Sequence, residues 1–93
     1  MSGSMTPSQH RRLERRERLE TVMELAHLAV ARQLRQAGAT HLERAEVRTM
    51  LIELLELDRD RDVELALDEG ASLAAAGRAL RITRQAAAKR YRP

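Results

Sequence analysis

The sequence lacks cysteine, phenylalanine and tryptophan, and its one aromatic residue is Tyr91. Without cysteine the chain has no disulfide, no thiolate zinc site and no catalytic thiol. Strands favour aromatic and β-branched residues, whereas alanine, leucine, arginine and glutamate, all good helix formers, dominate this chain. The composition therefore predicts an all-α protein.

Long apolar runs are also absent, and none approaches the roughly 20 residues that span a bilayer. The three histidines, His10, His27 and His41, have no metal-like spacing. Glu53 and Glu56 form a carboxylate pair, but no His or Lys is placed to work with them. We find no nucleophile, phosphate-cradling loop or cofactor motif, and therefore expect a protein that is not an enzyme. Since nothing resembles a secretion signal or a membrane span, we expect it in the cytoplasm. It should need no cofactor, metal or small-molecule substrate and contact no membrane.

The first helix is predicted from Ser8 to about Ala37, because apolar residues recur there at steps of three and four. Residues 1–7 are expected to be a disordered, tag-like N-terminus. Pro7 and the neighbouring hydroxyl residues are typical of a helix start, and Gly38 is typical of a helix end.

A second, leucine-rich helix is predicted to begin at the capping box of Thr40 and Glu43. The alternating charges of Asp58–Asp62 interrupt its apolar spacing. The helix therefore either breaks near Asp58–Asp60 or continues to Gly70, and we favour a break. This predicts a helical dimerisation region over 8–57 and a helix-turn-helix region over 58–93.

The first helix has an apolar stripe along one face, and the apolar surface of the second is too broad for a single neighbouring helix. We expect these faces to form a homodimer; the alternative is a monomeric bundle that uses them internally. The residues predicted at the dimer contact are Leu19, Met23, Val30, Leu34, Met50, Leu51, Leu54 and Leu55.

The net charge of +3 conceals a strong segregation of charge along the chain. Glu43–Glu69 contains ten acids and four bases, whereas Ser72–Pro93 contains six bases and no acid. We interpret the acidic segment as a solvated helix face. The basic segment instead indicates a surface directed at a polyanion.

A second basic cluster lies near the N-terminus, interleaved with two glutamates. It is either an arm that grips phosphates or the minor groove, or a solvated helix end with local ion pairs, which we favour. Its arginines are Arg11, Arg12, Arg15, Arg16 and Arg18.

The C-terminal segment has the features of two short helices joined by three residues. Ser72 is a predicted N-cap for a helix over 73–80, and Thr83 for one from Arg84 to about Arg92. Gly77 is small enough for the helices to cross closely, and Ala87 and Tyr91 would form the buried face of the second. Such a pair, with a basic second helix, is the geometry of a helix-turn-helix.

The stretch GASLAAAGRALRITRQAAAKRY, residues 70–91, resembles the helix-turn-helix of small bacterial DNA-binding proteins of the GC-rich, actinobacterial type. The pattern of that family is G-A-S-aromatic-x-x-I-G-x-x-L-G-[VI]-[ST]-R-Q-A-A-x-x-R-[FY], and the resemblance covers the C-terminal quarter of the chain. Three positions depart from it: Leu73 replaces an aromatic residue, Ala76 a larger aliphatic one, and Arg81 the turn glycine. The first two make the core of the motif smaller, so the motif should pack against the preceding helix. The third demands a left-handed backbone from an arginine, at a cost of about 1 kcal/mol.

The resemblance implies a nucleoid-associated, dimeric transcriptional regulator that places its last helix in the major groove of double-stranded DNA. Two alternatives remain open: a module that binds a protein of the transcription machinery, and a nucleoid protein that binds DNA without sequence preference. The residues implied to face the bases are Thr83, Arg84, Gln85, Ala88 and Lys89. Those implied to contact phosphates are Ser72, Arg78, Arg81, Arg90 and Arg92.

Overall fold

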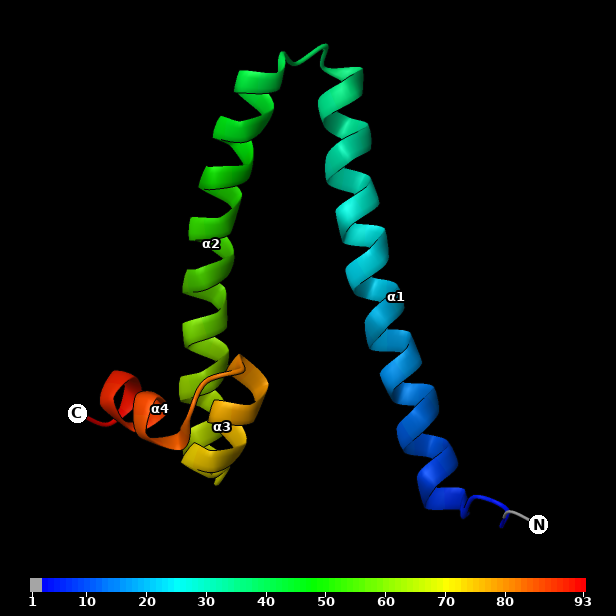
Figure 1. Ribbon diagram of the computed structural model, residues 1–93, viewed down its shortest axis with the longest axis vertical. Helices are drawn as coiled ribbons and strands as arrows, with labels where there is room; N and C mark the ends of the chain where they lie inside the picture. The colour runs from blue at the N-terminus through cyan, green and yellow to red at the C-terminus, as the bar shows by residue number, and fades with distance from the viewer. Residues whose placement is uncertain (1–2) are drawn as a thin grey trace. The chain divides into compact units, whose positions relative to one another are not determined.

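The computed structural model describes residues 3–93, which form four helices and no strand (Figure 1). Two long helices precede two short ones that pack together, so the predicted all-α class is confirmed. Within the described residues, no helix is both long enough and apolar enough to cross a membrane. The helices are α1 (Pro7–Gln36), α2 (His41–Asp68), α3 (Leu73–Leu80) and α4 (Arg84–Tyr91).

The chain divides into two compact units, the first ending at Arg44 and the second comprising Ala45–Pro93. This division falls in the first turns of α2, whereas the sequence predicted a boundary between residues 57 and 58, well inside that helix. The proposed tag-like N-terminus is described only from Gly3 onward; Met1 and Ser2 lie outside the described residues.

The first unit is organised by local capping. Thr6 begins α1, because its hydroxyl accepts from the Gln9 amide at 3.1 Å while the Gln9 side chain accepts from the Thr6 amide at 2.8 Å. The helix starts one residue before the predicted Ser8. Gly38, with φ 67°, follows its end as predicted.

The predicted capping box at the start of α2 is confirmed. The Thr40 hydroxyl accepts from the Glu43 amide at 3.2 Å, and the Glu43 carboxylate accepts from the Thr40 amide at 2.8 Å. The backbone hydrogen bond from Thr40 lowers the pKa of Glu43, because it stabilises the charged carboxylate. The box therefore satisfies two amides that the first turn of a helix would otherwise leave unpaired.

The predicted break near Asp58–Asp60 is wrong, because α2 is one continuous helix from His41 to Asp68. The segment 58–62 contains neither glycine nor proline, so nothing in it prevents helical hydrogen bonding. Four of its five charged side chains are exposed and Asp60 is half-buried, and the first buried residue of α2 is Val63, which is 8% exposed. Loss of apolar periodicity here marked a charged stretch of the helix rather than its end.

In the second unit, α3 and α4 have the predicted caps and turn. The Ser72 hydroxyl accepts from the Ala75 amide, and the Thr83 hydroxyl accepts from the Ala86 amide, both at 3.0 Å. Arg81 has φ 58° and ψ 40°, so the left-handed conformation expected where the resemblance places a glycine is present.

The core of the second unit is small and joins all three of its helices. Ala87 is fully buried and Tyr91 is 6% exposed, as predicted for the inner face of α4. Because α2 supplies part of this core, the expectation that the motif packs against the preceding helix is confirmed. The core consists of Val63, Ala76, Ala87 and Tyr91, with Leu67 and Leu80 packed against it.

The residues predicted at a dimer contact differ in exposure. Leu34 is buried, at 7% exposed, and Val30 and Leu51 are half-buried. The other five have exposed fractions from 56% to 65%; they are Leu19, Met23, Met50, Leu54 and Leu55.

Candidate nucleic-acid interface

The exposed face of α4 carries the polar side chains predicted to face DNA bases. Residues 85 and 89 lie about 160° around the helix from the buried Ala87, given 100° per residue. Arg84, Gln85 and Lys89 are exposed, and Ala88 is half-buried beside them. Thr83 is exposed too, but its hydroxyl caps the helix.

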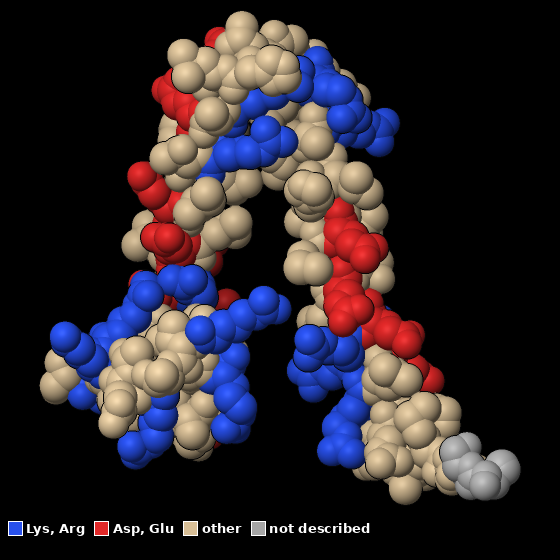
Figure 2. Space-filling model, in the orientation of Figure 1, with Lys and Arg blue, Asp and Glu red and all other residues tan. Residues whose placement is uncertain are grey.

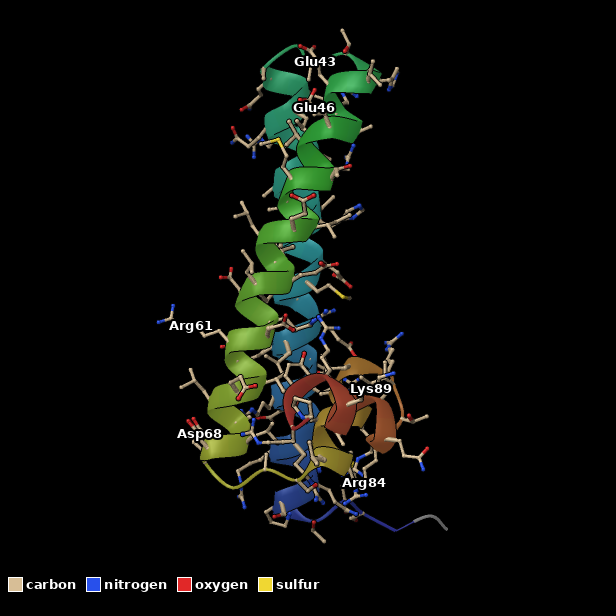
Figure 3. The ribbon with its side chains drawn as sticks, turned by 90° about the vertical axis from the view of Figure 1, so that its left-hand side faces the viewer. Glu43, Glu46, Arg61, Asp68, Arg84 and Lys89 are labelled. Carbon is tan, nitrogen blue, oxygen red and sulfur yellow. The ribbon has the colours of Figure 1, made fainter. Side chains whose placement is uncertain are left out.

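Four cations of this region are exposed and have no salt bridge within residues 3–93. Figure 2 shows the lobe of α3 and α4 with basic side chains spread over the visible face and acidic ones on the α2 shaft above it. In Figure 3, Arg84 and Lys89 lie to the right of α2, in the short C-terminal helices, whereas Arg61 and Asp68 lie along its left-hand edge. The four are Arg78, Arg81, Arg84 and Lys89.

The helices α3 and α4 approach each other at Gly77, which is buried. A Cβ atom at this position would lie 2.9 Å from the carbonyl oxygen of Ile82 and 3.2 Å from the backbone nitrogen of Arg84. Only glycine leaves room for this approach. The backbone at the start of α4 is thus held directly against α3.

Arg90 and Arg92 are engaged differently from the other cations, because each binds carboxylates of α2. Arg90 Nη2 lies 3.1 Å from Asp60 Oδ1. Arg92 Nη1 lies 2.8 Å from Glu64 Oε2, and its Nη2 lies 3.7 Å from Asp68 Oδ1. Both were predicted to contact phosphates, but here each is ion-paired within the chain.

Tyr91 anchors the same end of α4 to α2. Its hydroxyl donates to Asp60 Oδ1 at 2.6 Å, and the Arg90 guanidinium lies 5.5 Å from the centre of its ring. Burial, and then the hydrogen bond to Asp60, raise the pKa of Tyr91. The hydrogen bond from Tyr91, aided by Arg90, lowers the pKa of Asp60.

The sequence analysis missed the role of Asp60, Glu64 and Asp68, which we call the acidic stripe, in binding the end of α4. They were treated as part of a solvated face. Their spacing of four residues was the available signal, since residues i, i+4 and i+8 lie on one side of a helix. Their partners, 24 to 31 positions away in the sequence, could not be identified from that spacing alone.

Comparison with protein-family models, with curated proteins and with solved structures finds no match for this chain.

Proposed function

We propose that the protein is a sequence-specific DNA-binding protein that inserts α4 into the major groove. The observation that carries the proposal is the pair α3–α4, which exposes Arg84, Gln85 and Lys89 on one face of a short capped helix. The α2 carboxylates nearest to α4, those of Asp60 and Glu64, are paired with Arg90 and Arg92, so their charge is partly neutralised there. A recognition helix of a helix-turn-helix contacts base edges with its N-terminal residues.

The side chains of α4 fit distinct roles at base edges. Arg84 has the two-pronged donor set that pairs with guanine, and Gln85 has the donor and acceptor that pair with adenine. Lys89 lies one turn further along, and Thr83 and Ala88 complete the surface. The small Ala88 side chain allows close approach to a thymine methyl group.

The remaining free cations suit phosphate contacts, which position a protein on DNA without reading its sequence. Arg78 is in α3 and Arg81 is in the turn, so they flank the proposed recognition helix. Ser72 lies at the start of α3, and the amides at the start of a helix favour phosphate. Arg90 and Arg92 are less suited to this role, because a phosphate would have to displace an α2 carboxylate.

We further propose that two copies bind together as a regulator of transcription. A single motif makes few base contacts, whereas two copies on a twofold axis read half-sites one DNA turn apart, about 34 Å. The support is apolar exposure: Leu19 and Met23 in α1 and Leu54 in α2 are 58% to 65% exposed. In α2, Val47, Met50, Leu54 and Leu57 follow the 3-4-3 spacing of a coiled-coil seam.

The test of DNA binding is selection from random duplexes, followed by affinity measurements with variants. Arg84→Ala should weaken binding to the selected sequence by about 1–3 kcal/mol and relax selectivity at one base pair. Arg61→Ala is the matched control, since it removes an exposed arginine of α2 that lies away from Arg84 (Figure 3). Equal losses in the two variants would contradict a base-reading role for Arg84.

The selection itself separates the alternatives. An enriched inverted repeat supports a dimeric regulator, and binding without enrichment indicates a protein that binds DNA of any sequence. No binding at low salt rules out the DNA proposal and indicates a protein partner instead. Light scattering on Leu54→Glu tests the dimer, because a charge in the apolar contact should reduce the mass to that of one chain.

A further inference from the structure

We propose that the acidic stripe of α2 determines the spacing of the two half-sites that the protein recognises, by fixing the direction of α4 relative to α2. Asp60, Glu64 and Asp68 are then positioning residues that touch no DNA. This inference rests on the proposed DNA-binding function and adds a specificity determinant to it.

The apolar contacts of α4 are too few to set its direction. The helix has eight residues, and only Ala87 and Tyr91 of these are buried. Alanine offers a single methyl group, so the contact at Ala87 resists sliding but not rotation. Dispersion and apolar burial are non-directional, so a small apolar contact keeps α4 close to the core but does not fix its angle to α2.

The two ends of α4 are held by different means. Its start is held by the backbone contact at Gly77, and its end is held by the stripe through Arg90, Tyr91 and Arg92. Hydrogen bonds and ion pairs are directional, so the second attachment selects one angle. Without it, α4 can pivot about its start; a rotation of about 10° moves the far end of this roughly 12 Å helix by about 2 Å.

The stripe connects α4 to the proposed dimer contact through a rigid element. Because α2 is unbroken from His41 to Asp68, its exposed apolar residues and the stripe belong to one helix. Leu54 and Glu64 are ten residues apart, which is about 15 Å along the axis. The distance between the recognition helices of two copies is therefore set by the dimer contact, this length of α2, and the angle held by the stripe.

The experiment measures affinity for the selected half-sites placed at successive spacings that differ by one base pair. The test variant is Asp60→Asn with Glu64→Gln, which keeps side-chain shape but removes the charges that hold Arg90 and Arg92. The matched control is Glu46→Gln with Glu53→Gln. It removes two negative charges from α2 at residues without a salt bridge among the described residues, so the net charge changes equally in the two variants.

For wild type and control we expect one preferred spacing. In the stripe variant, the ratio of affinities between that spacing and one changed by two base pairs should fall about fivefold, since several exposed ion pairs together have an effect of this size. Affinity for a single half-site should be at least that of the control, because the variant also frees Arg90 and Arg92 for phosphates. Tyr91→Phe keeps the ion pairs of the stripe and should fall between the two.

Three results would overturn the inference. If the ratio of affinities between spacings is unchanged in the stripe variant and in Tyr91→Phe, the stripe does not set the spacing. The proposed function still stands if the wild type binds its selected site. A wild type that binds half-sites equally at all spacings also refutes it. A wild type that binds no DNA refutes the proposed function and the inference together. Circular dichroism shows whether the double variant folds. If it does not, the affinity ratio of Tyr91→Phe tests the inference, and the Tyr91 absorbance of the wild type reports the contact to Asp60.

Discussion

The substitution Gly77→Ala tests the close approach of α3 and α4, on which the geometry of the candidate interface depends. The added methyl group would meet backbone atoms, at 2.9 Å from Ile82 O and 3.2 Å from both Arg84 N and Thr83 C. Backbone atoms cannot rotate away as the end of a flexible side chain can. The clash is relieved only if α4 and the turn before it move away from α3.

Two opposing effects determine the magnitude. Alanine is favoured over glycine inside a helix by about 1 kcal/mol. Inserting a methylene-sized group into a tight contact costs roughly 1–3 kcal/mol. Since the nearest atom lies closer than ordinary contact distance and belongs to the backbone, we expect the upper part of that range. The net loss in free energy of unfolding should be about 1–2 kcal/mol, or roughly 5–15 °C in Tm for a chain of this size.

The assay is thermal unfolding followed by circular dichroism, with wild type and variant at one protein concentration because association would shift both. Ala79→Gly, at an exposed position of the same helix, is the control and should show only the propensity cost of up to about 1 kcal/mol. DNA affinity of Gly77→Ala should fall as well, because the start of α4 is displaced. A Gly77→Ala protein that is more stable than wild type would refute the close approach.

Three further predictions concern the turn, the cap and the tyrosine. Arg81→Gly should raise the free energy of unfolding by up to about 1 kcal/mol, because glycine adopts the left-handed conformation without steric cost; Arg81→Ala retains the strain, and urea denaturation that finds the two variants equal would argue against it. Thr83→Ala should lower stability by about 1 kcal/mol through loss of the hydrogen bond to the Ala86 amide, whereas Thr83→Ser, which keeps a hydroxyl, should remain near wild type in the same assay. Because the folded-state pKa of Tyr91 is raised above its usual 10.0, its protonated form is favoured by folding, so this contribution is complete below pH 10 and lost as the pH rises through the folded-state pKa. Absorbance titration should show the high pKa, and Tyr91→Phe should lack this alkaline loss; parallel losses in both proteins would contradict the assignment.

The sequence by itself determined the local structure of this protein. The caps at Thr6, Thr40, Ser72 and Thr83 were predictable because each involves groups three residues apart. Such contacts form within one turn of chain and depend little on the rest of the fold. The left-handed Arg81 was expected only through the resemblance, whose pattern has a glycine at this position of the turn.

The face of α4 was also predictable, because helical periodicity places Ala87 and Tyr91 together and Gln85 and Lys89 opposite them. Periodicity failed where apolar residues were missing. Across Asp58–Asp62 it could not distinguish the end of a helix from an exposed helical turn, and α2 proved continuous. Good helix formers without glycine or proline were the better guide there.

Only the tertiary structure decided which charges are available. In the sequence, the six C-terminal cations form one basic group, and the acids of α2 form a separate solvated face. In the folded second unit, Asp60 and Glu64 pair with Arg90 and Arg92, while Arg84 and Lys89 make no salt bridge among the described residues. These pairings join residues about 30 positions apart. They depend on the angle between α2 and α4, which no local pattern encodes, because many angles satisfy the same small apolar core.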